Sequence, residues 1–357
     1  MEELSRRELL LCSLNRQYLL EKGERMQVVG DLLGLQAQFA QNPVYALRIR
    51  ARDFQPETWG QGLVKIWSHR GTIHAVRQDQ LGLLLSARGV ERQWEEGRWG
   101  ISAADQARWA AFIQRQTEQG TGRREELKQA CRQAGMAEEL LDKVFYGWGG
   151  LLKEMCDRGI LVYQSGAEKR FALPGPIQWT DRRQARLAVI EQYFKTYGPA
   201  TLADCAAFTG WKMAEIRRLA EELPLKQIRC GEGTYCYLGD LNPAGQLPRC
   251  LFLAGFDQLV LGYRDRSRLI DRRDLGNVTN QAGIVYPILL LRGRARARWK
   301  KAPGKLIVQP FRPLSLGDRQ AIAAKGKKLF AEENVQTEFL PPLEETQNRK
   351  GGQRDES

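Results

Sequence analysis

Apolar and polar positions follow helical and strand-like periods along much of the chain, and the clearest pattern lies in residues 184–238. A helical run there stops at Gly198-Pro199, a pair that ends helices well. Thr201 begins a second, short helix, and Trp211 precedes a third whose apolar residues recur at helical spacing. Two strand-like runs follow around Gly231-Glu232-Gly233, a hairpin turn signal. Three helices followed by a hairpin predict a winged helix.

The same order of elements recurs earlier in the chain. A helix is expected over residues 125–134, further helical turns reach Gly159, and two strands follow around Ser165-Gly166. The first hundred residues show the order less cleanly, with three predicted helices and one predicted hairpin, at residues 4–20, 25–38, 44–51 and 65–76. These are repeats of pattern rather than of sequence identity.

After about residue 245 the residue pattern becomes typical of β-strands separated by turns, with one helix expected near Gly317–Phe330. This region predicts a small sheet or barrel. The expected fold class is therefore α+β, with three tandem winged-helix units and a small C-terminal β-barrel. The predicted divisions are a first unit at 1–100, a second at 101–178, a third at 179–243, the β-rich domain at 244–344 and a disordered tail at 345–357.

Charge changes this picture by suggesting a partner. The 357 residues include 55 basic and 42 acidic side chains, for a formal net charge of +13. Such a field favours polyanions, of which nucleic acid is the first candidate. The alternative is that the excess charge serves only solubility. A hydrophobic content of 43% is enough for real cores, which argues against a disordered chain.

Cysteine and histidine usage limits the chemistry. Seven cysteines are dispersed without CxxC spacing, which fits reduced thiols in a cytosol better than a disulfide framework. With only two histidines, a structural zinc site is not expected, and neither a metal nor a cofactor is predicted. The N-terminus lacks a signal-peptide core, and no stretch approaches the length of a membrane span. We therefore expect a soluble, cytoplasmic protein.

Five cations alternate along one β-like segment, LRGRARARWKK. On a strand, this period places them on one face, with apolar residues opposite. The five are Arg292, Arg294, Arg296, Arg298 and Lys300. Such a row is suited to binding a phosphate backbone, because the cations repel one another unless nearby anions neutralise them. The alternative is an ordinary solvated strand face.

Both histidines lie in one short segment, WSHRGTIHAV. Its polar members His69, Arg70, Thr72 and His74 are candidates to line a groove or a probing hairpin that contacts DNA. On a strand Thr72 and His74 share one face. The alternative is that the two histidines cap a turn and satisfy hydrogen bonds within the core.

The segment Gln36-Ala37-Gln38 lies just before the helix-start signal Asn42-Pro43. Residues two apart diverge by about 200° on a helix, so the two glutamines share a face only where the backbone leaves helical geometry. In isolation they are two polar residues near a helix end.

Four stretches in the same order carry a family resemblance: DLLGLQAQFAQNPVYALRIR, WSHRGTIHAV, YGPATLADCAAFTGW and GFDQLVLGYRDRSRL. Together they resemble the winged-helix DNA glycosylases of the AlkZ and YcaQ type, which unhook interstrand DNA crosslinks. The resemblance implies three winged helices around a DNA channel, a C-terminal β-barrel and a monomer. It also implies that Gln36 and Gln38 form a catalytic motif of the Gln-apolar-Gln kind. The family's usual glycine before a strand tryptophan is replaced here, because Arg298 precedes Trp299.

The chemistry that this family implies needs no metal. An N7-alkylated guanine is cationic and leaves as a neutral base, so the enzyme must stabilise an oxocarbenium-like sugar and place a water beside it. A glutamine amide is no base near neutral pH, but its carbonyl accepts a hydrogen bond from water. Gln36 and Gln38 are therefore expected to position this water beside the sugar. The expected partner is double-stranded DNA that carries an alkylated or crosslinked guanine.

Three alternatives remain open in the sequence. Asp257 is a rival general base, and would need to lie beside Gln36. In the GYRDR segment, Arg264, Asp265 and Arg266 are expected either to form an ion pair or to touch DNA. A non-catalytic winged-helix regulator is the competing function, although its recognition helix KMAEIRRLAEEL carries several acids and is poorly suited to base reading.

Overall fold

The computed structural model describes residues 2–52, 54–89, 93–147, 149–166 and 168–344. These residues divide between two compact units, whose limits along the chain are Met1–Val28, Gln41–Phe54 and Glu191–Ser357 for one and Val29–Ala40 and Gln55–Ile190 for the other. We call them unit 1 and unit 2. The predicted boundaries at residues 100 and 178 both fall inside unit 2, and the four-part division stays a prediction.

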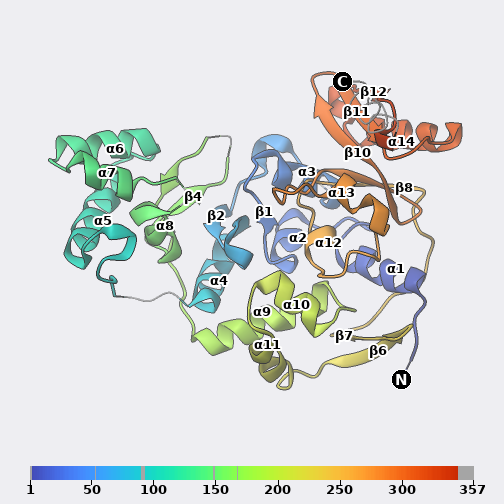
Figure 1. Cartoon of the computed structure of the whole chain (residues 1–357), viewed down its shortest axis with the longest axis horizontal. Helices are drawn as coiled ribbons and strands as arrows, with labels where there is room; N and C mark the ends of the chain where they lie inside the picture. Colours follow the sequence, from blue (N-terminus) through green and yellow to red (C-terminus); the bar gives the residue numbers. More distant parts are fainter. Residues whose placement is uncertain (1, 53, 90–92, 148, 167, 345–357) are drawn as a thin grey trace, which may run out of the picture. The chain divides into compact units, whose positions relative to one another are not determined.

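Unit 2 combines a mixed set of strands and helices (Figure 1). Its strands are β1 Leu35–Gln36, β2 Leu63–Trp67, β3 Ile73–Arg77, β4 Val162–Gln164 and β5 Phe171–Ala172. Its helices are α4 Leu81–Arg88, α5 Ala103–Glu118, α6 Arg124–Gln133, α7 Glu138–Val144 and α8 Gly150–Asp157, with short 3-10 turns at Pro56–Thr58, His69–Gly71, Gln78–Gln80 and Arg98–Gly100. Helices α2 Arg25–Asp31 and α9 Arg182–Thr196 run along the chain from one unit into the other.

The strands of unit 2 form one antiparallel sheet in the order β1-β3-β2-β4-β5. The two predicted hairpins, β2–β3 and β4–β5, are both present. They are not separate wings, because β2 pairs with β4 through Val64↔Gln164 and Lys65↔Tyr163. An apolar cluster formed by residues of α5–α8 and their neighbours includes Ile113 and Leu151, both fully buried, and packs these helices together.

One predicted helix in this region is present but ends earlier than expected. The pattern favoured a helix over residues 25–38, but α2 ends at Asp31 and the chain enters β1 at Leu35. Leu33 and Gly34 both adopt positive φ, 56° and 98°, which a continuing helix cannot accommodate. A side chain at Gly34 would clash with Val76 of β3, whose Cγ1 lies 2.7 Å from the ideal Cβ position. The glycine therefore lets β1 lie against β3.

Unit 1 contains the remaining elements. Its further helices are α1 Arg6–Arg16, α3 Gln41–Arg50, α10 Leu202–Thr209, α11 Met213–Ala220, α12 Gln258–Leu261, α13 Leu275–Val278 and α14 Leu316–Leu329, with 3-10 turns at Arg272–Asp274 and Ala331–Glu333. Its strands are β6 Lys226–Cys230, β7 Gly233–Tyr237, β8 Cys250–Leu253, β9 Ile288–Leu291, β10 Arg294–Ala302, β11 Lys305–Pro310 and β12 Gln336–Phe339.

The helix–helix–helix–hairpin order predicted for residues 184–238 is present as α9, α10, α11 and the β6–β7 pair. Thr201 caps α10 by accepting a hydrogen bond from the Asp204 amide, while Asp204 accepts one in return from the Thr201 amide. Gly210, at φ 78°, ends the helix in the left-handed conformation. The local signals for this segment were therefore sufficient.

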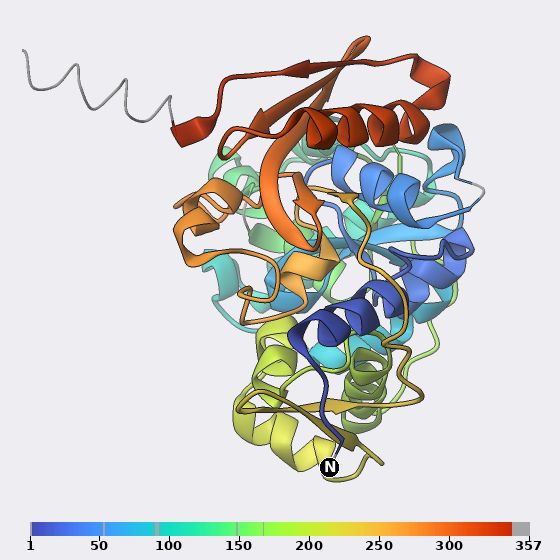
Figure 2. The same cartoon turned by 90° about the vertical axis from the view of Figure 1, so that its right-hand side faces the viewer.

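The predicted C-terminal barrel is wrong in one respect, because the five strands form an open sheet in the order β12-β11-β10-β9-β8. Closure would need β8 to pair with β12, and no such pair is present among the described residues. Instead α14, in the expected position, packs against both edge strands and covers one face of the sheet (Figure 2). The predicted tail, 345–357, lies outside the described residues.

Candidate active site in unit 2

Gln36 and His74 lie directly opposite each other in the β1–β3 pair. Partners in an antiparallel pair project from the same face of the sheet, with Cβ atoms about 5 Å apart. Gln36 is 5% exposed and His74 fully buried. The fold thus brings one glutamine of the predicted motif next to one histidine of the predicted hairpin.

The Gln36-Ala37-Gln38 segment is extended where it meets β3. The Ala37 amide donates a 2.8 Å hydrogen bond to the Ile73 carbonyl, which continues the pairing one residue beyond β1. In extended backbone, residues two apart project to the same side, so this geometry favours a common side for the two glutamines. The condition that the sequence set, a backbone outside helical geometry, is met.

Both glutamine amides are available to a ligand. Within the described ranges, neither Gln36 nor Gln38 forms a side-chain hydrogen bond to the protein. A primary amide offers two donors and a carbonyl with two lone pairs, and these groups need partners when they are shielded from bulk solvent. Such a pair of amides suits a bound water or a polar ligand.

The two histidines form a buried, neutral pair. Their ring centroids are 5.5 Å apart in an edge-to-face arrangement. Burial is the largest cause that lowers the pKa of His69, to about 3, and burial also lowers the pKa of His74 well below its ordinary value. Both rings are therefore uncharged at neutral pH.

Hydrogen bonds to backbone carbonyls assign the tautomers. His69 Nε2 donates to the Leu33 carbonyl at 3.2 Å, and His74 Nδ1 donates to the Thr72 carbonyl at 3.1 Å. The proton on His74 Nδ1 leaves Nε2 with a free lone pair. This atom is buried and has no hydrogen-bond partner among the described residues. It is an acceptor on the same sheet face as Gln36.

The histidines thus satisfy hydrogen bonds within the core, as the alternative interpretation expected, while their contact with DNA stays a prediction. His69 is 6% exposed, and each ring bonds to backbone within the core. The partly exposed members of the hairpin are Arg70, at φ 55°, and Thr72. Contact of Arg70 and Thr72 with DNA stays a prediction.

Phe39 is a feature that the sequence reasoning missed. It follows Gln38 directly and is 47% exposed, among the largest exposures of any big apolar side chain in the described chain. An exposed ring beside a polar motif offers a face on which a nucleobase can stack. The signal in the sequence was an aromatic residue in a turn, which has no helical or strand periodicity to explain it.

The row of cations in unit 1 is only partly as predicted. Residues 294–300 alternate between a buried and a more exposed face on β10, but Arg292 precedes the strand, at φ 48°. Carboxylates of the protein itself neutralise the first three cations of the row. Arg292 pairs with Asp318, whereas Arg294 and Arg296 pair with Asp271.

The last two cations of the row differ from the first three. Arg298 donates to the Asn277 and Gly276 carbonyls and lies over the Tyr286 ring at 3.9 Å. Lys300 is exposed and has no ion pair within the described residues. Of the five, Lys300 is therefore the cation most available to a phosphate.

Asp257 is engaged in the core of unit 1 and has no role as a base in this structure. Its side chain is fully buried and pairs with Arg50 through both carboxylate oxygens, at 2.6 and 3.0 Å. The same carboxylate accepts the amides of Ala254 and Leu259, at 3.1 and 2.9 Å. Each oxygen accepts two hydrogen bonds, which leaves no position for an attacking water.

The GYRDR segment forms no internal ion pair among its described side chains. The amides of Arg264 and Asp265 donate to the Asp204 carboxylate, and Arg266 donates to Thr279 at 3.0 Å. Asp265 accepts hydrogen bonds from the amide and hydroxyl of Ser267. These contacts organise the loop, while the exposed Arg264 side chain keeps DNA contact as a prediction.

No group of three or more metal-ligating side chains occurs among the described residues, and none of the described helices has the length and apolar character to span a membrane.

Comparison with known proteins places this geometry in context. The family described as DNA glycosylase AlkZ-like matches residues 29–331. An interstrand DNA cross-link repair glycosylase of Streptomyces sahachiroi is 25% identical over 345 residues, which span 85% of this chain and 90% of the relative. The solved structure of the Streptomyces sahachiroi DNA glycosylase AlkZ superposes with a TM-score of 0.76 at 21% identity, and covers 95% of this chain and 100% of that one.

Proposed function

Because this chain belongs to the AlkZ-like DNA glycosylase family, we propose that it hydrolyses the N-glycosidic bond of N7-alkylated purine nucleotides in double-stranded DNA. Its substrates include interstrand crosslinks, a proposal supported by the cross-link repair role in the name of the Streptomyces sahachiroi relative. It acts in base excision repair, as a monofunctional glycosylase and a monomer, and needs no cofactor.

The observation that carries the proposal is the pairing of Gln36 with His74 beside a second free amide. His74 Nε2 is a buried acceptor, and an acceptor at that position suits the NH₂ group of Gln36. We propose that the Gln36 NH₂ group donates to His74 Nε2 in the reactive complex, which leaves the carbonyl of the same amide free to accept from water. The carbonyls of Gln36 and Gln38 then accept hydrogen bonds from one water and hold it for attack on the sugar; the bond to the departing neutral base breaks as the new carbon–oxygen bond forms, and the proton that the water loses passes to solvent.

The electrostatics suit a cationic transition state. Positive charge moves from the alkylated base to the sugar as the bond breaks, and carbonyl dipoles stabilise that charge without any proton transfer. His69 and His74 are neutral because burial lowers the pKa of each, so they add no opposing positive charge. The site is thereby suited to labile cationic adducts and unsuited to normal bases, whose departure requires protonation.

DNA contacts are proposed on both units. On unit 2, Arg70 and Thr72 of the β2–β3 hairpin contact the duplex near the lesion, and Phe39 stacks on a base. On unit 1, Lys300 and Arg264 contact phosphates. We further propose that α9, α10 and α11 with the β6–β7 hairpin form a winged helix.

The test is release of base from a duplex that carries one N7-methylguanine. The native protein is compared with Gln36→Ala, Gln38→Ala and the control Gln129→Ala, which changes an exposed glutamine of α6. Removal of one preorganised dipole costs about 10²–10³-fold in rate at sites of this type. We expect a loss of that size in the first two variants and none in the control.

Each result has a definite meaning. A steep loss confined to the two site variants supports the proposed chemistry, and unhooking of a crosslinked duplex by the native protein extends it to crosslinks. Tight duplex binding without release above the spontaneous rate contradicts the proposal and favours a non-catalytic DNA-binding protein.

A further inference from the structure

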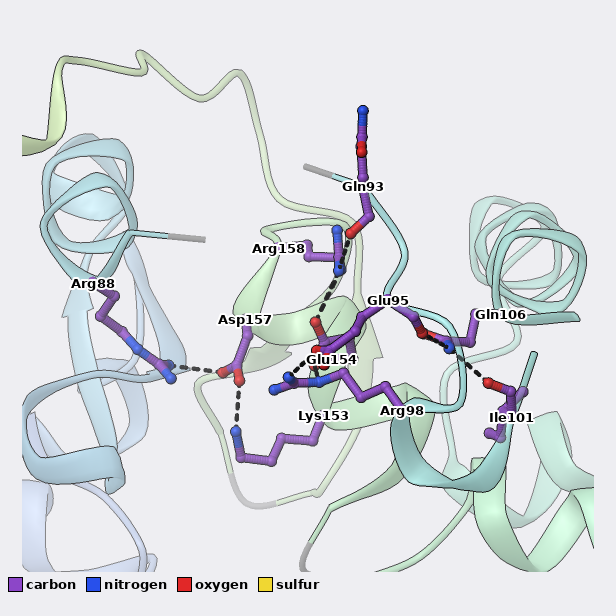
Figure 3. Close-up of polar contacts among 10 residues, drawn as sticks. All are labelled: Arg88, Gln93, Glu95, Arg98, Ile101, Gln106, Lys153, Glu154, Asp157 and Arg158. Carbon is purple, nitrogen blue, oxygen red and sulfur yellow. Dashed lines mark hydrogen bonds and ion pairs between the residues drawn. The ribbon is translucent and has the colours of Figure 1, made fainter. Parts of the chain in front are cut away.

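The turn end of the β2–β3 hairpin is held by side chains from two helices of unit 2. Arg88, the last residue of α4, donates from Nη1 to the Trp67 carbonyl at 2.6 Å and to Asp157 Oδ1 at 2.7 Å. Trp67 is the last residue of β2 and immediately precedes the turn that carries His69 and Arg70. Figure 3 shows Arg88 reaching across from its helix to Asp157 of α8.

Asp157 joins this cation to a second one. Lys153, one turn earlier on α8, donates to Asp157 Oδ2 at 2.5 Å, and its Nζ lies 5.1 Å from the centroid of the Trp67 ring. Trp67 is therefore contacted twice, at its carbonyl by Arg88 and at its ring by Lys153. The Asp157 side chain is only 11% exposed, so the pairing is little screened by solvent. We call Arg88, Lys153 and Asp157 the hairpin brace.

The brace leads to the motif in two steps across the sheet, of which the second is a hydrogen bond. Trp67 pairs with Ile73 across the hairpin, and the Ile73 carbonyl accepts the 2.8 Å hydrogen bond from Ala37. Ala37 is the residue between the two candidate catalytic glutamines. A displacement of Trp67 would therefore displace Ile73 and, through it, the backbone at Ala37 that orients the side chains of Gln36 and Gln38.

A neighbouring ion cluster on the same helix provides a comparison. Glu154, three residues before Asp157, accepts Arg98 Nε at 2.8 Å and Arg158 Nε at 3.1 Å (Figure 3). Its side chain is 8% exposed, as buried as that of Asp157. The contacts of Glu154 tie α8 to the segment around Arg98 rather than to Trp67. The two carboxylates thus share a helix and a degree of burial and differ in what they hold.

We propose that Asp157 is a positioning residue for base release, which acts through Arg88 and Lys153 to fix the turn end of the β2–β3 hairpin and thereby the placement of Gln36 and Gln38. The inference rests on the proposed glycosylase function. Asp157 itself touches neither the substrate nor the two glutamines. Its effect is on geometry, and a displacement of about 1 Å at a reacting centre is enough to cost up to about 10²-fold in rate.

The test compares Asp157→Asn with Glu154→Gln, each of which removes one buried charge from α8. Single-turnover release at saturating protein gives the rate constant of the chemical step, and a duplex titration gives Kd. We expect Asp157→Asn to lower the rate constant about tenfold or more with Kd within about twofold, and Glu154→Gln to leave both nearly unchanged. Asp157→Glu, which keeps the charge, should restore part of the rate.

Amide hydrogen exchange of the protein without DNA separates this inference from the proposed function. The amides of Ala37 and Ser68, which donate to Ile73 and Thr72, should exchange faster in Asp157→Asn than in Glu154→Gln. Equal exchange and equal release in the two variants would overturn the role of Asp157, as would a rate loss accounted for by unfolding alone. If the native protein releases no base, the proposed function fails, while faster exchange at Ala37 still supports the brace.

Discussion

The clearest quantitative expectation concerns Asp257, because the structure assigns it to the core and its carboxylate would otherwise be a rival catalytic base. Asp257→Asn removes the charge that compensates Arg50, whose side chain is also fully buried. Loss of one partner of a buried ion pair costs about 3–5 kcal/mol, since the other charge is left without compensation. The α12 cap adds nothing to this cost, because an asparagine side-chain oxygen accepts the Leu259 amide as well as a carboxylate does.

Urea unfolding measures this cost. With a denaturant slope of about 2 kcal/mol per molar, the transition of unit 1 should move down by about 2 M in Asp257→Asn. The double variant Arg50→Met/Asp257→Leu removes both charges and should recover much of the loss, because no buried ion then lacks a partner. Base release at low temperature, expressed per folded molecule, should stay within about twofold of the native rate.

The opposite pattern would refute this reasoning. An unfolding transition that moves by less than about 0.3 M, together with a loss of release of 10²-fold or more, would make Asp257 a catalytic group. The four hydrogen bonds to its carboxylate would then have to open during the reaction.

Two further predictions follow from the charges of the two units. Burial lowers the pKa of His69 to about 3 and lowers the pKa of His74 as well. Below about pH 6.5 the two histidines therefore take up protons in the unfolded chain but not in the folded one. The free energy of unfolding should fall as the pH drops from about 6.5 toward 3. Urea midpoints at pH 7.5, 6 and 5 check this, and a midpoint that does not change over that range would contradict the buried, neutral pair. On unit 1, Lys300→Ala should reduce the slope of log Kd against log salt by about 0.9 for duplex DNA, whereas Arg296→Ala, which removes an arginine already paired with Asp271, should reduce it less. A larger change for Arg296→Ala than for Lys300→Ala would show that the internal ion pair opens on binding.

Local signals in the sequence were sufficient where one segment determines its own structure. Thr201 and Gly210 define the two ends of α10 by short-range hydrogen bonds, and the apolar alternation of β10 is visible in the order of its residues. The sequence did not decide between a sheet and a barrel for the C-terminal strands, because that choice depends on α14 packing over strands that lie far apart in the chain.

The candidate site shows the same limit more sharply. The pattern extended a helix through Gln38, and only the resemblance to a family singled out the two glutamines. Their juxtaposition with His74 arises from the pairing of β1 with β3, which a helical interpretation of residues 25–38 excludes. Likewise, the cations of β10 were visible in the sequence, but their partners Asp271 and Asp318 were not, since nothing local links those carboxylates to the strand.

The single sheet of unit 2 has a consequence for how the chain folds during synthesis. Lys65 of β2 pairs with Tyr163 of β4, which leaves the ribosome roughly a hundred residues later. At about 5–20 residues per second, β2 waits on the order of 5–20 s with an unpaired edge that any other strand can join. A lysine on such an edge discourages pairing with other chains, because its charge is costly to bury between two strands. Lys65, which is buried in the folded protein, thus disfavours pairing of β2 with other chains until β4 is synthesised.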